Sequence, residues 1–241
     1  LLVGLATAKA LAAAHELPLA PVDHLHGHVA ASFLGPEPLE PPFVSLVASG
    51  GHTFVARVDD HGPGYEVLGQ TLDDAAGEAF DKGARMLGLG YPGGPVVDRM
   101  ARRGDPARWP LPVPSLPGLE YSFSGLKTAL RYRIRDLGGS EALDEKARAD
   151  LAAAFERSVV ESLLEKVRLA WDRWPAPEVV ICGGVAANSL LRRRAEETME
   201  GRARVTIPPL SLCTDNAAMI GAAAPYTPAE TELGADASLG W

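Results

Sequence analysis

The chain has 241 residues and a mass of 25.4 kDa, enough for one large domain or two modest lobes around a hydrophobic core. A composition of 46% apolar and 22% charged residues is ordinary for a globular protein. No uninterrupted apolar run reaches the roughly 18 residues of a membrane helix, so we expect no membrane association and a cytoplasmic location. A net charge of -8 argues against a free-standing nucleic-acid-binding protein, because phosphate affinity comes from clustered Lys and Arg. Two cysteines, Cys182 and Cys213, are too few for a disulfide scaffold or a cysteine zinc ribbon, and we expect both to be small buried residues.

The first 42 residues contain two predicted helices. Residues 2–16 are rich in Ala and Leu and predict a helix, and residues 19–22 predict a short strand. A second helix is expected over about 23–33, because Asp23 is a natural N-cap residue. The segment 37–42 has the composition of a linker, and here we place a boundary between two lobes.

The rest of the chain changes from strands to helices and then to an α/β pattern. Alternating apolar runs predict an antiparallel meander of strands over 43–49, 52–58 and 65–71. Helical spacing follows over 73–89, and after an interruption at 91–95 and a loop rich in Pro and Gly at 104–120 it returns over 124–137 and 144–173. The last predicted elements are strands at 178–184 and 203–208 and helices at 187–197 and 214–224.

Two histidines in the segment DHLHGHVAASF are candidate metal ligands. His24 and His28 are four residues apart on the predicted helix, so their imidazoles project from the same face. Two such imidazoles can share an iron or zinc ion at ~2.0–2.1 Å per bond. An isolated pair of this spacing is more often structural, and His26 is expected to face elsewhere. Leu25 stands where the zinc proteases of the H-E-x-x-H type have their glutamate base.

The segment SGGHT between two predicted strands is a candidate ligand-binding turn. Gly50 and Gly51 let the backbone approach a ligand closely, and the exposed N–H groups and neighbouring hydroxyls suit phosphate oxygens. A tight hairpin turn explains the same residues equally well, so both interpretations stay open.

Two later segments lead into predicted helices. In CGGVAAN a buried strand ends in a glycine turn before Asn188, an arrangement of nucleotide sites in α/β proteins, although Asn188 would also serve as a plain helix cap. In CTDNAAM, Asp215 would complete a site of two histidines and one carboxylate, and Thr214 or Asp215 as N-cap is the alternative.

The order of these motifs along the chain resembles the TsaD/Gcp family. The resemblance extends from about Leu2 to Gly221 and is carried by KALAAAHELPLAPVDHLHGH, LVASGGHT, DDAAGEAFDKGARMLGLGYPGGP, FSGLKTA, ICGGVAANSLLR and CTDNAAMIG. Members of that family have the two-lobed α/β fold shared by actin, sugar kinases and Hsp70 (the ASKHA fold), with RNase H-like lobes. They transfer a threonylcarbamoyl group from threonylcarbamoyl-AMP to the N6 amine of the adenosine beside the anticodon, in tRNAs that read ANN codons.

The resemblance also implies a division of the chain. Residues 1–40 would be the remainder of an N-terminal lobe with the metal-binding helix, and residues 41–241 a C-terminal lobe with a helical insertion at about 73–173. Family members have about a third of their length, with a glycine-rich first strand, before the point where this chain begins. Together with Leu1 in place of Met, this predicts a truncated chain with an incomplete first lobe, whose activity and folding are in question.

Matched motif by motif, the resemblance assigns roles to particular residues. An iron ion, one per subunit, with zinc as the alternative, would be held by His24, His28 and Asp215. The threonylcarbamoyl-AMP site would be lined by Val47, Ala48, Ser49, Gly50 and Gly51. Carboxylates suit ribose hydroxyls and glycine admits a flat base, and the adenylate-binding positions would be Asp81, Gly94, Asp98 and Asn188. The family usually has Glu where this chain has His26, a change on another face of the helix.

The chemistry that the resemblance implies is direct transfer. The metal would polarise the carbamoyl or phosphate oxygens while the tRNA amine attacks the carbamoyl carbon and AMP leaves. No Ser, Cys or Lys nucleophile with an adjacent base stands out, so we expect no covalent intermediate. Homologues of TsaB and TsaE are the expected protein partners, because an acidic chain needs help to present tRNA. Two basic clusters are candidate phosphate contacts or solvated helix faces: Lys127, Arg131, Arg133 and Arg135, and Arg192 to Arg194.

Two other functions stay open. A metal-dependent O-sialoglycoprotein endopeptidase is an older assignment for the family, and the absent glutamate base argues against it. The other is a non-catalytic scaffold similar to TsaB. A scaffold has no need of the candidate ligands and adenylate-binding residues, so their joint presence counts against it.

Overall fold

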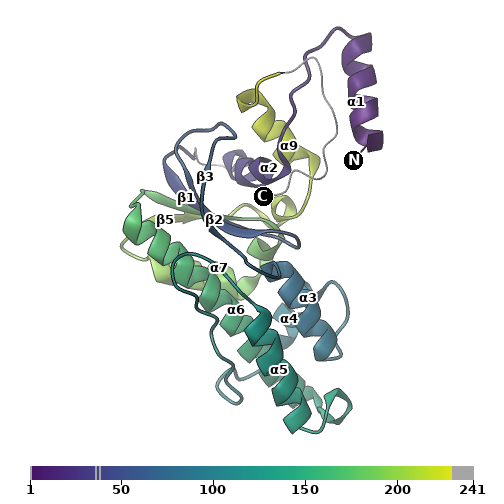
Figure 1. Cartoon of the computed structure of the whole chain (residues 1–241), viewed down its shortest axis with the longest axis vertical. Coiled ribbons are helices and arrows are strands. Elements are labelled where there is room, and N and C mark those ends of the chain that lie inside the picture. The colour runs from purple at the N-terminus through teal and green to yellow at the C-terminus, as the bar shows by residue number, and fades with distance from the viewer. Residues whose placement is uncertain (1, 36, 38, 230–241) are drawn as a thin grey trace.

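A computed structural model describes residues 2–35, 37 and 39–229 of the chain. Its centre is a five-stranded mixed sheet with the strand order β3-β2-β1-β4-β5 (Figure 1). The strands are β1 (Phe43–Ala48), β2 (Thr53–Val58), β3 (Glu66–Gln70), β4 (Glu178–Cys182) and β5 (Arg204–Thr206). The first three form the predicted antiparallel meander, and β4 joins β1, and β5 joins β4, in parallel. The α/β fold class is therefore confirmed.

The burial of the strands follows their place in the sheet. Every residue of β1 and of β4 is buried, as expected for central strands covered on both faces. Both segments are accordingly continuous apolar runs with little alternation. The edge strand β3 exposes three of its five residues.

One face of the sheet is covered by the long helices (Figure 1). These are α3 (Ala76–Met86), α4 (Gly93–Ala101), α5 (Ser124–Asp136), α6 (Glu145–Arg173) and α7 (Ser189–Met199). They share the larger hydrophobic core with β1, β2 and β4, and α6 runs through its centre. The helices predicted over 73–89, 124–137 and 144–173 are thus confirmed.

The loop rich in Pro and Gly at 104–120 is tied to α6 by polar side chains from the interior. Ser158 and Ser162 donate hydrogen bonds to carbonyl groups of this loop, at 3.2 and 2.8 Å. Lys166, which is 1% exposed, donates to two further carbonyls of the loop. These buried donors are satisfied by backbone acceptors, so a segment without regular structure lies in a fixed position against the helix.

The opposite face of the sheet carries a second, smaller core. It is formed by α2 (His24–Ala30), which packs on β1, β2 and β4, and α9 (Ala217–Ala223) packs on α2. The two helices approach each other closely at Gly27, where a Cβ would lie 2.9 Å from Ile220 Cδ1. This packing brings the segment before α9 beside the histidines of α2.

The ends of the described chain depart from the prediction in detail. Helix α1 (Leu2–Ala14) is confirmed, and none of its residues is buried. The predicted strand over 19–22 is wrong, since only Leu19 forms an isolated bridge. Pro18 and Pro21 lack the backbone N–H groups that a strand ladder requires. The short helix α8 (Leu210–Cys213) was not expected, and short 3₁₀ segments are Ala31–Leu34, Ser140–Ala142, Gly184–Ala187 and Ala224–Tyr226.

Three further expectations concern the chain as a whole. Cys182 and Cys213 are both buried and free, as predicted. Within the described ranges, no helix is both long enough and apolar enough to cross a membrane. The division into lobes near residue 40 stays a prediction.

Candidate functional site

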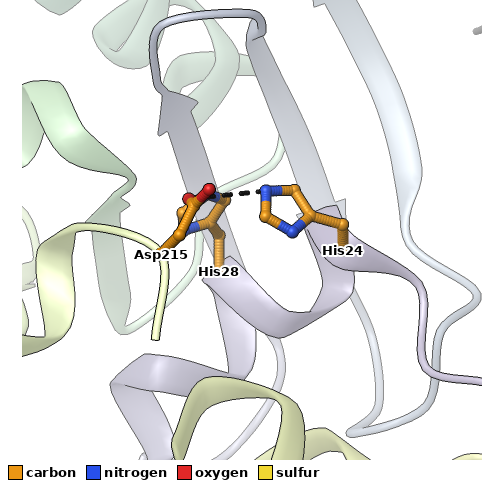
Figure 2. Close-up of side chains that lie close together, drawn as sticks. All are labelled: His24, His28 and Asp215. Carbon is orange, nitrogen blue, oxygen red and sulfur yellow. Dashed lines mark ion pairs between the residues drawn. The ribbon is translucent and has the colours of Figure 1, made fainter. Parts of the chain in front are cut away.

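The first turn of α2 places the two candidate histidines. Asp23 is the N-cap, and its carboxylate accepts hydrogen bonds from the backbone N–H groups of Leu25 at 3.0 Å and His26 at 2.8 Å. His24 and His28 lie on one face of the helix with ring centroids 4.8 Å apart, edge to face. The predicted orientation of the pair is therefore confirmed (Figure 2).

Asp215 reaches the same point from the loop before α9. The N-cap of α9 is Asn216, whose side chain accepts a hydrogen bond from Met219 N at 2.9 Å. Capping by Thr214 or Asp215, the alternative left open above, is thus wrong. Asp215 points toward the histidines instead, with Oδ1 3.5 Å from His24 Nε2 and 3.3 Å from His28 Nε2.

The donor set of these three side chains fits a metal ion. Their ligand atoms all lie within 4.8 Å of one another. Two atoms bound at ~2.0–2.1 Å to a common tetrahedral ion are about 3.3–3.4 Å apart, close to both Nε2–Oδ1 distances. His28 is 1% exposed, and apart from the contact of its Nε2 with Asp215 its ring nitrogens have no hydrogen-bond partner among the described residues. Burial, followed by the nearby His24, lowers the pKa of His28, and this favours the neutral imidazole that binds metals.

His26 has a structural role in this helix. It is 1% exposed, and its Nε2 donates a hydrogen bond to the backbone carbonyl of His61 at 3.0 Å. Burial lowers the pKa of His26, so the neutral ring is favoured here as well. It stands apart from the cluster of His24, His28 and Asp215, as expected from its position on the helix.

The segment SGGHT forms a tight hairpin turn between β1 and β2. Ser49 N donates to the carbonyl of His52 at 2.8 Å, and His52 N donates to Ser49 Oγ at 3.1 Å. The start of α3 packs against this turn, because a Cβ on Gly77 would lie 2.6 Å from Ser49 O. The tight-turn interpretation is therefore confirmed, while ligand binding by the exposed Gly50 and Gly51 stays a prediction.

Val47 and Ala48 lie differently from the turn that follows them. Both are completely buried in β1, Val47 in the smaller core and Ala48 in the larger one. Their side chains therefore lie in the hydrophobic cores on the two faces of the sheet. Gly51 lines a separate cavity of about 180 Å³ beside Leu25 and Tyr65.

Five of the predicted substrate positions line one cavity of about 490 Å³ on the helical side of the sheet: Gly50, Asp81, Gly94, Asp98 and Asn188. Its apolar wall includes Phe80, Pro92 and Val185. Thr214 also lines it, and the next residue in the chain is the candidate metal ligand Asp215. The structure thus brings the predicted adenylate positions together and places them next to the histidine cluster through Thr214.

The wall formed by α3 and α4 depends on a close contact of their backbones. Asp81 accepts a hydrogen bond from Gly93 N at 2.7 Å, at the first turn of α4. A Cβ on Gly93 would lie 2.4 Å from Asp81 Cα, so only glycine fits. Further along α4, Asp98 Oδ2 accepts a hydrogen bond from Arg102 Nη2 at 2.7 Å.

Asn188 is held by two partners at the start of α7. Its Oδ1 caps the helix by accepting from Leu191 N at 2.9 Å, so the plain cap suggested by the sequence is present. Its Nδ2 donates to Glu156 Oε1 at 2.6 Å. Glu156 was missed in the sequence, although a carboxylate among the apolar positions of α6 is a detectable signal. Ser189, Arg102 and Thr214 carried no such signal.

Each of the two basic clusters has a residue that forms contacts within the protein: Lys127 in one and Arg192 in the other. Lys127 is 15% exposed and forms an ion pair with Asp74. Arg192 donates to the backbone carbonyls of Ala186 and Pro208, each at 2.7 Å. Arg131 remains exposed on α5, where its guanidinium lies over the ring of Tyr132.

Comparisons with solved structures show the fold alone. A crystal structure of HypF from T. kodakarensis aligns with a TM-score of 0.66 at 14% identity, over 90% of this chain and 38% of that one. Full-length HypF in its phosphate- and nucleotide-bound form aligns with a TM-score of 0.63 at 15% identity, over 84% and 35% of the two chains.

Comparisons of the sequence show the family. The model for "TsaD: tRNA N6-adenosine threonylcarbamoyltransferase" matches residues 1–222. A protein of that name from Thermodesulfovibrio yellowstonii is 52% identical over 91% of this chain, and one from Bordetella avium is 50% identical over 93%. The chain spans 66% of the length of each of these relatives. On this agreement along nearly the whole sequence, the chain belongs to the TsaD family.

Proposed function

We propose that this protein transfers the threonylcarbamoyl group from threonylcarbamoyl-AMP to the N6 amine of the adenosine beside the anticodon, in tRNAs that read ANN codons. One observation carries the proposal beyond family membership. The cavity lined by Asp81, Gly94, Asp98 and Asn188 meets the cluster of His24, His28 and Asp215 at Thr214. An adenylate and a metal-held acyl group therefore have adjoining places in one chain.

The cavity suits the adenosine part of the substrate. Its apolar wall with Gly94 accepts a flat base, and the carboxylates of Asp81 and Asp98 are acceptors for ribose hydroxyls. The exposed Gly50 in the turn between β1 and β2 offers its backbone to the phosphate and the carbamoyl group. Val47 and Ala48 would act only through their backbone, since their side chains are buried.

His24, His28 and Asp215 would hold one iron ion per chain, with zinc as the alternative. Two histidines and one carboxylate are a common ligand set of non-haem iron, and they leave coordination positions for a substrate. When bound, the ion would supply Lewis-acid polarisation of the carbamoyl or phosphate oxygens. The tRNA amine attacks the carbamoyl carbon, the bond from that carbon to the phosphate oxygen breaks, and AMP leaves.

tRNA is the proposed acceptor, and homologues of TsaB and TsaE are the proposed protein partners. The net charge of -8 and the internal pairing of Lys127 and Arg192 leave this chain little positive surface for an RNA. Arg131, which is exposed on α5, is a candidate tRNA contact. We predict that charge reversal at Arg131 weakens tRNA binding and leaves AMP binding unchanged. We keep the cytoplasm as the expected compartment, since the tRNA acceptor is there.

The transfer assay combines the purified protein, threonylcarbamoyl-AMP and unmodified tRNA, with nucleoside mass spectrometry as the readout. It is run on this chain and on the longest reading frame that contains it. Formation of threonylcarbamoyladenosine supports the proposal. Its absence from both proteins, in the presence of TsaB and TsaE homologues and iron, would refute it.

The same preparations test the two alternatives. Metal-dependent cleavage of an O-sialoglycoprotein would favour the endopeptidase, which the absence of a glutamate beside His24 argues against. A protein that binds neither iron nor zinc would favour the scaffold.

A further inference from the structure

Glu156 is a buried carboxylate beside the adenylate cavity, the cavity of about 490 Å³ lined by Asp81, Gly94, Asp98 and Asn188, and the proposed function gives it no role. It lies on α6 and is 4% exposed. Its Oε1 accepts the hydrogen bond from Asn188 Nδ2 at 2.6 Å. Behind the adenylate cavity it lines a second cavity of about 610 Å³, together with Arg102 and Ser189. Arg102 lines both cavities, and hydrogen bonds from Asn188 to Glu156 and from Ser189 to Asp98 join residues of one cavity to residues of the other.

The second partner of Glu156 is the carboxylate of Asp98, which is 8% exposed. Two buried carboxylates in contact share a proton, because both charges cannot be held side by side in the interior. Arg102 and Ser189 both donate hydrogen bonds to Asp98, so the oxygens of Asp98 act as acceptors. In the described part of the chain, no Lys, Arg or His lies within hydrogen-bond distance of Glu156. The shared proton is therefore carried by Glu156.

We propose that Glu156 is a positioning residue of the adenylate cavity, which holds Asn188 through one accepted hydrogen bond and Asp98 through one donated hydrogen bond. The inference rests on the proposed function, because Asp98 and Asn188 matter only if this cavity binds the adenylate. It assigns Glu156 no contact with the substrate.

The hydrogen bonds of Asn188 show why positioning matters. Its carbonyl oxygen caps α7, and one of its two amide hydrogens points to Glu156. This fixes which side of the carboxamide faces the cavity and leaves the other amide hydrogen for a ligand. Without Glu156 the amide of Asn188 keeps only the cap bond from Leu191 N, and Asp98 keeps only its bonds from Arg102 and Ser189, so both groups are held less firmly.

Three variants separate positioning from packing. Glu156→Gln keeps the acceptor for Asn188 and carries a permanent donor toward Asp98, so it mimics the protonated side chain. Glu156→Met fills a similar volume and offers neither bond. Glu165→Gln makes the same chemical change nine residues along α6, where Glu165 lines neither cavity, and serves as the matched control.

The first measurement is calorimetric titration with AMP at pH 6.5, on the longest reading frame that contains this chain. We expect Glu156→Met to weaken AMP binding roughly tenfold, since the hydrogen bonds of Glu156 with Asn188 and Asp98 are lost. Glu156→Gln and Glu165→Gln are expected to bind as the unaltered protein does. Equal affinity of Glu156→Met and the unaltered protein, or an affinity of Glu156→Gln as weak as that of Glu156→Met, would overturn the proposal.

The pH dependence of AMP affinity gives an independent test, because a residue that served only in packing would not change it. Burial, opposed by the hydrogen bond from Asn188 and reinforced by Asp98, raises the pKa of Glu156 to about 7. The charged groups that line the second cavity with Glu156 are Arg102 of α4, Arg157 and Glu161 of α6, and Arg193 and Arg194 of α7. Those of the adenylate cavity are Asp81 of α3 and Asp98, Arg99 and Arg102 of α4. The arginines keep their charge at every pH used.

The AMP dissociation constant of the unaltered protein, divided by that of Glu156→Gln, isolates the effect of the proton on Glu156. Protonation of AMP itself affects both proteins equally, so it cancels in this ratio. We expect a ratio near one at pH 6 and about ten at pH 8, where the unaltered side chain has lost its donor. A ratio that stays constant from pH 6 to 8 would overturn the proposal even if Glu156→Met failed to fold. Failure of the unaltered protein to bind AMP at all would instead refute the proposed function, and the inference with it.

Discussion

At the scale of single residues, the candidate metal site depends on which polar groups already have partners. Asn216 takes the N-cap of α9, so the carboxylate of Asp215 is left to face the histidines. His26 donates a hydrogen bond to a backbone carbonyl, whereas within the described ranges the ring nitrogens of His28 have no such partner apart from Asp215. Helical spacing was enough to predict the pairing of His24 with His28. It offered Thr214 or Asp215 as the N-cap of α9 and missed Asn216, although all three residue types are able to cap a helix.

Removal of Asp215 is predicted to abolish stoichiometric metal binding. Asp215→Asn leaves the two imidazoles but replaces the anionic ligand, and we expect iron or zinc affinity to fall at least ~100-fold. The metal content after dialysis, measured by mass spectrometry, gives the result. The control is His15→Ala, which removes an exposed histidine outside the cluster. Equal metal content in Asp215→Asn and His15→Ala would contradict the assignment of the site.

At the scale of elements, periodicity in the sequence located most helices and strands, because each buries one face or both faces. The prediction failed over 19–22, where two prolines prevent a ladder. It also missed Glu156, since a charged residue on an amphipathic helix is ordinarily placed on its exposed side. The contact between α3 and α4 could not be predicted, because the need for glycine at position 93 is evident only once Asp81 is known to pack against it.

The start of α5 is capped by a residue from another segment. Its own N-cap, Phe123, offers no side-chain bond, and Asp73 accepts from Phe123 N at 2.8 Å and from Ser124 Oγ at 2.7 Å. Burial opposes ionisation of Asp73, but hydrogen bonds from Ser122, Phe123 and Ser124 outweigh it and lower its pKa to about 2. A depressed pKa in the folded state means that this stabilisation is present above the unfolded value near 4 and is lost as the pH falls toward 2.

We therefore predict that Asp73→Asn lowers the free energy of unfolding by about 1 kcal/mol at pH 7. The difference from the unaltered protein should shrink as the pH falls from 4 to 2. Urea unfolding at pH 7 and pH 3 measures both values. A difference that grows toward low pH would show that the carboxylate is not the stabilising form.

Neighbouring glycines of α4 are predicted to respond differently to the same substitution. Gly93→Ala forces a Cβ to within 2.4 Å of Asp81 Cα and should lower the free energy of unfolding by ~1–3 kcal/mol. Gly94→Ala has no heavy atom within 4 Å of the new Cβ, so stability should be kept while AMP binding weakens at the cavity wall. Thermal unfolding and AMP titration separate the two effects. A stable Gly93→Ala protein would contradict the close approach of α3 and α4.

At the scale of the whole molecule, the sheet separates two groups of candidate site residues, which must meet at one place if the proposed function is right. Helix α2, which carries the histidines, lies on one side of the sheet, and α3 and α4, which line the candidate adenylate cavity, lie on the other (Figure 1). The turn between β1 and β2 and the loop from α8 to α9 connect them, through Gly50 and Thr214. The sequence indicated both groups through the order of its motifs, but their meeting point depends on the parallel pairing of β1 with β4, which joins distant segments.

Binding of AMP is predicted to stabilise the whole fold, because the cavity is built from α3, α4 and the start of α7 together. At 100 times its dissociation constant, AMP should add about 2.7 kcal/mol to the free energy of unfolding. Asn188→Ala should lose most of this gain, and differential scanning calorimetry at fixed protein concentration measures it. Equal stabilisation of Asn188→Ala and the unaltered protein would place AMP elsewhere.

The most direct test of the central claim is the rate of threonylcarbamoyl transfer to unmodified tRNA by variants from each half of the site. It uses the longest reading frame that contains this chain, with iron and homologues of TsaB and TsaE. We predict that His28→Ala and Asn188→Ala each lower the rate at least ~100-fold, while His15→Ala and Glu165→Gln leave it unchanged. Full activity of His28→Ala or Asn188→Ala would contradict the account, because it would show that transfer does not use that half of the site.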